Sequence, residues 1–331
     1  MLSKHFKKFS NEKEAVAFLR RKGLLDKGAV APCPRCGGEM KETKRKERNS
    51  EIKPTLRCNA RDCQTFRQIR NVTVICYFNY LNNRVGCKFS LSQSLELIFY
   101  FTQDIPCDSV HELTDRGTKE ICDWFNMCRK VCSQIVSVSN RGKMVGTEED
   151  PVQIDIAWFV GRPQHHRGRM MQDHVPESND SNTEVENTRN HGGLIDGPWV
   201  FGLKKGGDCR YFYVQRRNRE TLEHIIQREV EENSVIDFDD WPTYSDLNRL
   251  NYRHLTVNHQ RHYVDPNTGA NTQAIERSYL DSKLSHILKK IKRVNETTFQ
   301  SHLDYYCWRI MRKNSDHLFL AFLADVQSIH R

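Results

Sequence analysis

The chain after Pro151 alternates short β-rich segments with helical ones, and this order constrains the fold more than any other feature of the sequence. Runs rich in aromatic and β-branched residues, separated by turn residues, are typical of strands. Consecutive strands that then alternate with helices predict an α/β domain with a mixed sheet. The expected strands are QIDIAWF (153–159), PWVFGLKK (198–205), CRYFYVQR (209–216), SVIDFD (234–239) and RHLTVNH (253–259), and the expected helices are TLEHIIQREVE (221–231) and NTQAIERSYLDSKLSHILKKI (271–291).

The chain before this domain divides into three parts by composition. We expect an N-terminal helix within 1–30, a small cysteine-bearing module at 31–70, and a helical region at 71–149 that resembles a helix-turn-helix. The α/β domain is predicted to cover 150–313, and 314–331 is predicted to be a C-terminal tail. Within the α/β domain, residues 171–192 are polar, acidic and nearly free of large apolar side chains, so we expect a disordered insertion there.

Four of the twelve cysteines are spaced as two metal-binding knuckles. Cys33 and Cys36 form a C-x2-C pair, and Cys58 and Cys63 follow as a C-x4-C pair. Four thiolates can surround one zinc ion tetrahedrally, and a module this small needs such a crosslink to fold. We therefore expect one structural zinc, since four thiolates leave no open position for catalysis. Unliganded buried cysteines are the alternative. For Cys122, Cys128 and Cys132, core packing on one helix is the simpler interpretation.

The basic residues are concentrated at the N-terminal end of the chain. Residues 1–70 hold 19 Lys and Arg against 8 Asp and Glu, whereas the rest of the chain holds 32 against 34. Such a polarised charge indicates that the N-terminal part meets a polyanion such as DNA, although a solvated basic arm is the alternative. In the helical region, Lys119, Arg129 and Lys130 are candidate phosphate contacts, if these helices are not plain scaffolding.

No segment of the sequence predicts membrane insertion or secretion. The longest apolar run, at 95–101, is shorter than the roughly 18 residues that a spanning helix needs. The first residues, MLSKHFKKFSNEKEA, lack the apolar core of a signal peptide. We expect a soluble intracellular protein that does not bind membranes.

Acidic residues occur within or at the end of two strands that are otherwise apolar. Asp155 lies inside the first strand and Asp239 ends the fourth, and an acid at such a position is costly to bury unless a cation or partner compensates it. Glu276 follows near the start of the long helix, and Lys283 lies seven residues later on the same helix face. Three converging carboxylates can bind two divalent cations, preferably Mg²⁺ or Mn²⁺. Each acid also has an ordinary structural interpretation, and Asp240 competes with Asp239.

Several segments resemble the Merlin family of cut-and-paste DNA transposases and the bacterial ISXO2-like transposase domain. The resemblance covers most of the chain. Its most specific part runs from HLTVNH at 254 through YVDPNTGANTQAIE, which ends at Glu276. The other matching segments are FLRRKGLL, CPRCGG, QIDIAWF, the basic HHRGR at 165–169, GPWVFGLKK, VIDFDDWPTY and HLDYYCWRIMRK.

The resemblance implies a ribonuclease-H-like domain in which Asp155, Asp239 and Glu276 are the catalytic DDE triad, followed by the basic Lys283. It also adds His166, Arg167 and Arg169 as candidate DNA contacts. The sequence departs from the family at Ile156, where an acid commonly follows the first aspartate. A transposase would bind terminal inverted repeats and target DNA, cleave with Mg²⁺ or Mn²⁺, and pair two ends as a homo-oligomer in the nucleus. A domesticated, inactive DNA-binding protein is the alternative.

Overall fold

The computed structural model describes the chain as two compact units, which we treat separately. One unit comprises residues 1–142 with 301–331, and the other comprises residues 143–300. None of the helices in the described part of the chain combines the length and hydrophobicity that a membrane span requires. The described residues are 11–25, 32–46, 52–69, 89–139, 142–158, 199–215, 218–239, 247–257, 263–266, 268–284, 296–315 and 317–330.

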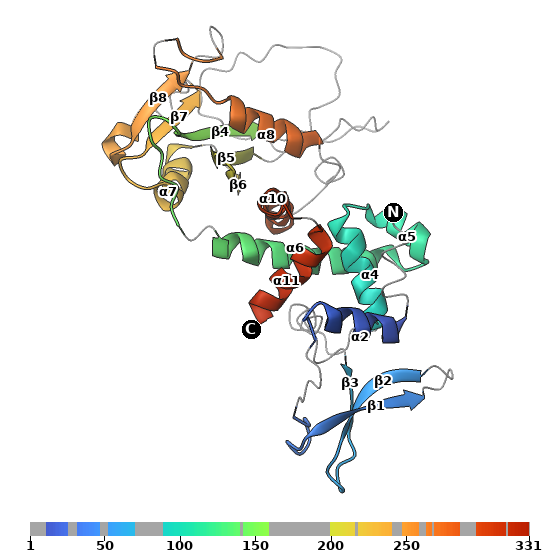
Figure 1. Cartoon of the computed structure of the whole chain (residues 1–331). Coiled ribbons are helices and arrows are strands. Elements are labelled where there is room, and N and C mark those ends of the chain that lie inside the picture. Colours follow the sequence, from blue (N-terminus) through green and yellow to red (C-terminus); the bar gives the residue numbers. More distant parts are fainter. Residues whose placement is uncertain are drawn as a thin grey trace, which may run out of the picture. The chain divides into compact units, whose positions relative to one another are not determined.

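The second unit is built on a five-stranded mixed sheet with the strand order β6-β5-β4-β7-β8 (Figure 1). The central strand β4 runs parallel to β7 and antiparallel to β5. Because β6 is antiparallel to β5 and β8 is parallel to β7, only β5 opposes the common direction. The predicted mixed α/β sheet is confirmed. The strands are β4 (Val152–Trp158), β5 (Trp199–Lys205), β6 (Asp208–Val214), β7 (Val235–Asp239) and β8 (Arg253–Val257).

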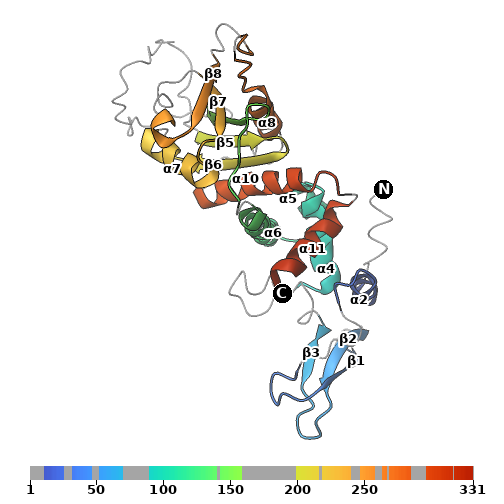
Figure 2. The ribbon, with the colours of Figure 1, turned by 60° about the vertical axis from the view of Figure 1, so that its left-hand side comes forward.

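Two helices flank this sheet on opposite sides, α7 (Arg219–Glu229) and α8 (Gln273–Leu284) (Figure 2). Helix α7 begins where the Asn218 side chain accepts a hydrogen bond from the backbone N–H of Thr221. Its buried Leu222 and Ile226 pack in one core with the apolar residues of β4 and β7. A short 3-10 helix, η4 (Leu247–Leu250), precedes β8. The sheet therefore has one apolar face under α7, which leaves its other face to α8.

The first unit contains the helices that the sequence predicted, joined by capped turns. In α4, Ser90 and Gln93 form a capping box, in which each side chain binds the backbone N–H of the other residue. The Glu12 carboxylate of α2 also accepts hydrogen bonds from the first two backbone N–H groups of α4. Within the helical region predicted at 71–149, the structure describes three helices between residues 91 and 139. The helices are α2 (Glu12–Arg21), α4 (Leu91–Thr102), α5 (Cys107–Thr114) and α6 (Thr118–Ser139).

The end of the chain packs into the first unit, which differs from the predicted tail at 314–331. Helix α10 (Glu296–Met311) places the Tyr305 hydroxyl 2.9 Å from the carbonyl oxygen of Phe101. Helix α11 (Leu318–His330) buries Phe322 completely, edge-on to Trp308. The boundary was missed because a run such as LFLAFLADV becomes a core helix only when another helix offers an apolar face. The acidic insertion predicted at 171–192 lies outside the described residues.

Candidate catalytic centre and cysteine cluster

The parallel pairing of β4 and β7 relates the positions of the two strand aspartates. In the parallel pair of β4 and β7, Val152 lies beside Ile236 and Gln153 beside Asp237. Asp155 and Asp239 each come two residues further along their strands, beyond the paired residues, and continuation of this register would set them level. Asp239 ends β7, at the edge where open α/β sheets place their ligand sites, whereas Asp155 is the central residue of β4. The side chain of Asp239 lies outside the described part of the structure.

Alternation along β4 separates Asp155 from Ile156. Ile156 packs against the hydrophobic core beneath α7, on the same face of β4 as the fully buried Ile154 two residues before it. Successive side chains of a strand point to opposite faces, so Asp155 belongs to the face that α8 covers. An acid at position 156 would therefore point into the α7 core instead of lying beside Asp155.

Helix α8 docks on β4 through polar contacts on both sides of Glu276. The backbone N–H of Ile275 donates to Oε1 of Gln153 at 3.1 Å. Three residues after Glu276, the Tyr279 hydroxyl lies 2.6 Å from the carbonyl oxygen of Asp155. The turn that carries Glu276 is thus tied to the strand that carries Asp155. Sequence spacing alone does not give this juxtaposition, because it depends on how the helix crosses the sheet.

The helix approaches the sheet this closely because β5 has a glycine opposite Asp155. Gly202 pairs with Asp155 in the antiparallel register. A Cβ atom at Gly202 would lie 2.5 Å from the Tyr279 hydroxyl oxygen and 3.0 Å from Cδ1 of Ile275. An isolated glycine within a strand pattern often marks such a close approach, so the sequence offered a signal for it.

Glu276 lies on the first turn of α8 and is partly buried. Its Oε1 accepts a hydrogen bond from the hydroxyl of Thr272 at 2.8 Å, and Thr272 is itself completely buried. A carboxylate is also favoured at a helix N-terminus by the helix dipole. The contact with Thr272 restricts the conformation of the Glu276 side chain.

A buried hydrogen-bond network, missed by the sequence interpretation, anchors the start of α8. Asp237 is 1% exposed, and its Oδ2 accepts from the backbone N–H of Asn271 at 3.0 Å. The Asn271 side chain in turn accepts from Nε2 of Gln153 at 3.0 Å. Among the described residues, Oδ1 of Asp237 has no hydrogen-bond partner, and burial raises the pKa of this carboxyl. Asp237 precedes Asp239 by two residues in an apolar strand, which was the available signal.

The other predicted DNA-contact and catalytic residues fall in different environments. Lys119 and Lys130 are exposed on α6, as a phosphate contact requires. Arg129 is partly buried and donates to Asn126, and burial lowers the pKa of its guanidinium. Lys283 lies in α8, but its side chain is outside the described part. Asp240, His166, Arg167 and Arg169 also lie outside the described residues.

The four predicted zinc ligands come together in the module at 32–69, which we call the cysteine module. The Sγ atoms of Cys33, Cys36, Cys58 and Cys63 all lie within 4.8 Å of one another. The Cys33–Cys63 and Cys36–Cys58 pairs are 3.6 Å and 3.5 Å apart, close to the separation of about 3.8 Å that tetrahedral Zn–S bonds of about 2.3 Å require. Among the described residues, no other group of His, Cys, Asp and Glu has this geometry.

Hydrogen bonds favour the thiolate form at two of these cysteines. A backbone hydrogen bond from Arg35 lowers the pKa of Cys33 to about 6, and the Thr65 hydroxyl, 3.0 Å from the sulfur, lowers the pKa of Cys63. The pKa of Cys36 is raised to about 12 beside the other thiols, and burial helps to raise the pKa of Cys58, so a bound cation would be needed to hold all four sulfurs as thiolates. The arrangement fits one zinc ion held by four sulfurs. Such a site is structural because no coordination position remains open.

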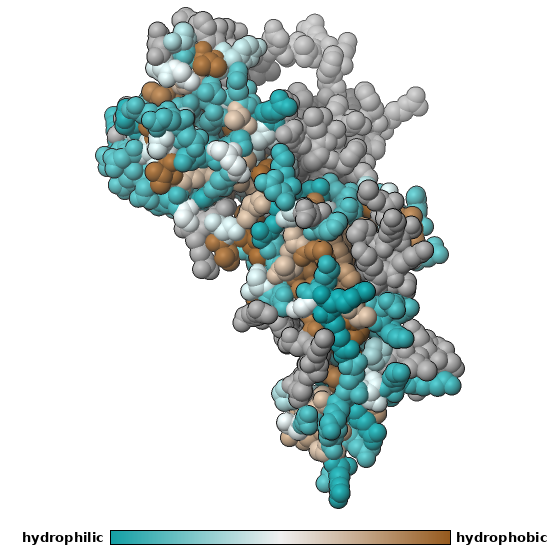
Figure 3. Space-filling view, in the orientation of Figure 1, coloured by the Kyte–Doolittle hydropathy of each residue, from teal (hydrophilic) through white to brown (hydrophobic). Residues whose placement is uncertain are grey.

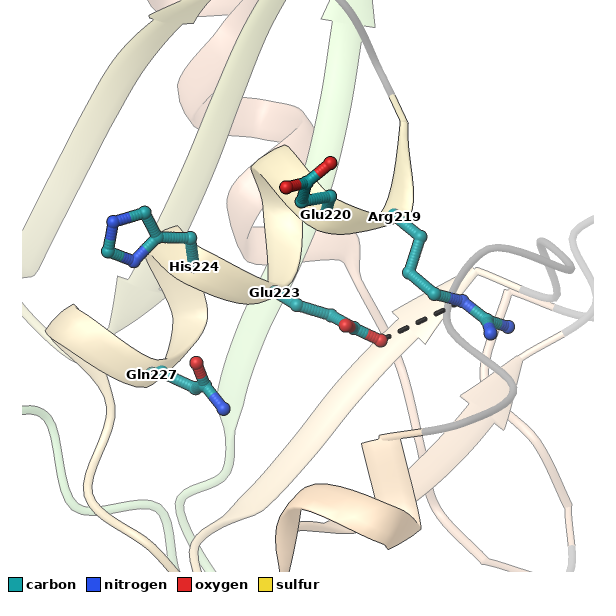
Figure 4. Close-up of a pocket in the computed structure, with 5 residues that line it drawn as sticks. All are labelled: Arg219, Glu220, Glu223, His224 and Gln227. Atoms are coloured by element: carbon teal, nitrogen blue, oxygen red, sulfur yellow. Dashed lines mark ion pairs between the residues drawn. The ribbon is translucent and has the colours of Figure 1, made fainter.

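A surface hollow on α7 is separate from the acidic residues. Arg219 forms an ion pair with Glu223 across one turn, with 3.7 Å between Nε and Oε1 (Figure 4). Helix α7 faces the apolar side of the sheet, whereas Asp155 lies on the α8 side. The hollow is therefore not part of the candidate catalytic centre. It is lined by Arg219, Glu220, Glu223, His224 and Gln227.

Residues 148–310 match the model of the ISXO2-like transposase domain. The matched segment runs from just before β4 to the end of α10 and includes both strand aspartates and Glu276. This match supports assigning the segment to a family of DDE-type transposases. A comparison with curated proteins gave no match.

Two solved structures align with much of the chain at low similarity. The Mos1 strand transfer complex is 12% identical, covers 75% of this chain and 80% of its own, and has a TM-score of 0.28. The Mos1 mariner paired end complex with Mn is 13% identical, covers 74% and 80%, and has the same TM-score of 0.28. Structural similarity at this level carries no argument about the fold.

The glycine opposite Asp155 gives a test of the α8 docking. Gly202→Ala should lower the free energy of unfolding by about 1–3 kcal/mol, because the new methyl group collides with Tyr279 and Ile275. Urea denaturation of the full chain measures the change. Gly207→Ala is the matched control, since a Cβ atom there meets nothing within 4 Å. Equal stability of the two variants would contradict the close approach of α8.

The cysteine cluster predicts about one zinc per chain in protein purified without chelator. Cys33→Ser or Cys58→Ser should release that zinc and unfold the cysteine module, because metal binding supplies the folding free energy of a module this small. Metal analysis and circular dichroism measure the two effects. Cys209→Ser, in a strand of the second unit, should retain the zinc. Wild-type protein without any zinc would rule the site out.

Proposed function

We propose that the protein is a cut-and-paste DNA transposase that binds terminal inverted repeats, hydrolyses a phosphodiester bond and transfers the freed strand end to target DNA. The observation that supports this best is that Asp155 and Asp239 each follow the paired Gln153 and Asp237 by two residues, while the helix that carries Glu276 is hydrogen-bonded to β4. The family match over residues 148–310 supports the same reaction class.

Asp155, Asp239 and Glu276 would hold the divalent cations, as carboxylate oxygens are the ligands that Mg²⁺ and Mn²⁺ prefer. When bound, such cations supply an activated attacking oxygen and stabilise the leaving oxygen. The protein residues hold the carboxylates in place: Thr272 binds Glu276, and Tyr279 binds the backbone of Asp155. The reaction needs no covalent enzyme intermediate, so positioning supplies much of the acceleration. Lys283, four residues beyond Tyr279 on α8, is proposed to contact the substrate phosphate.

The proposed DNA contacts lie mainly in the first unit, which includes the cysteine module. The excess of basic residues in 1–70 supports this, since phosphate neutralisation dominates non-specific DNA affinity. Exposed Lys119 and Lys130 on α6 are further proposed contacts, together with His166, Arg167 and Arg169. We also propose a structural zinc ribbon, a homo-oligomer that pairs two DNA ends, and a location in the nucleus.

The alternative is a domesticated DNA-binding protein that has lost the reaction, and Ile156 is the observation that favours it. The packing of Ile156 into the α7 core weakens this alternative, because an acid there would not join Asp155. The proposal of an active enzyme therefore remains compatible with this departure from the family.

The acids provide the main test of the function. Asp155→Asn and Glu276→Gln should each lower cleavage of repeat-containing DNA by about 10²-fold or more, because each removes a charged ligand with little change of shape. Duplex binding, measured by fluorescence anisotropy, should change little, since other residues bind the DNA. Glu220→Gln on α7 is the control, being an exposed acid of the opposite face. Wild-type protein that is inactive with both Mg²⁺ and Mn²⁺ would contradict the proposal.

Ile156 distinguishes the active enzyme from the domesticated alternative. Ile156→Glu should destabilise the protein by about 1–3 kcal/mol and should not increase cleavage, because the carboxylate would enter the α7 core. Ile156→Leu keeps the apolar contact and should cost less than about 1.5 kcal/mol. Urea denaturation and a cleavage assay on the same preparations give both readouts. Cleavage that appears only in Ile156→Glu would support the domesticated protein.

A further inference from the structure

The three-stranded sheet of the cysteine module has two chemically different faces. It consists of β1 (Met40–Lys46), β2 (Ile52–Cys58) and β3 (Phe66–Gln68), all antiparallel. One face carries the buried Met40 and Leu56, and α2 contacts the sheet at β2. Glu42 shares this face and forms an ion pair with Arg20 of α2. This face is therefore occupied within the first unit.

The other face carries only cations, amides, hydroxyls and one aromatic ring among its described side chains. The register aligns Lys41 with Arg57 and Arg57 with Phe66, so these three residues form one row across the strands. Arg45 lies on the same face, since it follows Lys41 by four residues in β1. We call Lys41, Arg45, Arg57 and Phe66 the basic face. The surface over β1 and β2 is mainly hydrophilic in the view of Figure 3.

The arginines of the basic face are gathered around an exposed phenylalanine. The Cζ atoms of Arg45 and Arg57 lie 4.8 Å and 5.7 Å from the ring centroid of Phe66, which is 41% exposed. Arg57 also donates to Oε1 of Gln64 at 2.9 Å. Cation–π contacts of this kind hold guanidinium groups near the sheet instead of leaving them free in solvent.

No carboxylate neutralises this face within the described part of the chain. Within the described part of the cysteine module, Glu42 on the opposite face forms an ion pair with Arg20 of α2. No ion pair there involves Lys41, Arg45 or Arg57. A preorganised guanidinium binds phosphate oxygens through two parallel N–H donors, and less side-chain entropy is lost when its position is already restricted. The chemistry that complements such a face is a row of phosphates.

We propose that the basic face binds the phosphate backbone of duplex DNA. Arg45 and Arg57 contact phosphates, and the Phe66 ring holds these two guanidinium groups in place. The choice of DNA as the partner rests on the proposed function. The proposal assigns three of the N-terminal cations, Lys41, Arg45 and Arg57, to one side of one sheet, whose other side contacts α2. The knuckle cysteines hold this sheet together, so zinc loss would remove the face as well.

The matched test compares two double variants that remove equal charge from opposite faces of the same strands. Arg45→Ala with Arg57→Ala removes the basic face, whereas Lys44→Ala with Lys46→Ala removes two exposed lysines from the opposite face of β1. Binding of full-length protein to a duplex carrying the element's own ends is measured by anisotropy at several salt concentrations. Zinc content and circular dichroism establish that both variants are folded.

The basic-face variant should bind at least about tenfold more weakly at 0.1 M salt, and its salt slope should fall by about 1.8, because two phosphate contacts are lost. The DNA affinity of the opposite-face variant should fall by less than about threefold, because its exposed lysines would not contact phosphates. Phe66→Leu should weaken binding severalfold with no change of charge, since the ring no longer restrains the guanidinium groups.

Equal weakening by both double variants would overturn the proposal, because charge would then act without regard to the face. Undiminished DNA binding by the basic-face variant would overturn it too. So would binding to heparin that is as tight as binding to DNA and is weakened equally by the basic-face variant. Failure of the proposed function and failure of this surface give different results. Absence of cleavage with intact face-dependent binding contradicts the transposase, whereas normal cleavage and binding by Arg45→Ala with Arg57→Ala contradicts only this surface.

Discussion

The close packing of α8 against β4 and β5 is the contact on which the candidate catalytic centre depends. Gly202 leaves room for Tyr279 and Ile275, and the Tyr279 hydroxyl reaches the carbonyl oxygens of Asp155 and Val200 at 2.6 Å and 3.2 Å. A side chain at 202 would lift the helix and move Glu276 away from the strand acids. The geometry of the carboxylates is thus decided by a residue that has no functional group.

The five-stranded sheet carries a hydrophobic core on one face and the candidate catalytic residues on the other. The apolar residues of β4 and β7 pack under α7, and the polar residues of the same strands face α8. Because strand side chains alternate, one strand can contribute to both a hydrophobic core and a polar site. Asp237 shows the cost of this arrangement, since it is buried with one oxygen unpaired. Its hydrogen bond to Asn271 helps to fix the start of α8.

The elements of the fold were largely predictable because local patterns determine them. The five strands, α7 and α8 were expected near their observed positions, and the cysteine pairs were expected to converge. The extent of the first unit was not predictable. Whether α11 is a tail or a core helix depends on the apolar surfaces of the preceding α10 and of α4, which is far away in the sequence.

By itself, the sequence determined which residues can do chemistry: two strand aspartates, a helix glutamate, four thiols and an N-terminal excess of cations. It did so because residue type and spacing along one element are local properties. Only the tertiary structure decided which of these residues meet. The register of β4 and β7 and the crossing of α8 at Gly202 arise from contacts between distant segments, and the sidedness of the β1–β3 sheet arises from the pairing of neighbouring strands. Hence Ile156, which stands out in the sequence as a departure from the family, belongs to the core. Gln153 and Asn271 do not stand out in the sequence, but they anchor the helix that carries Glu276.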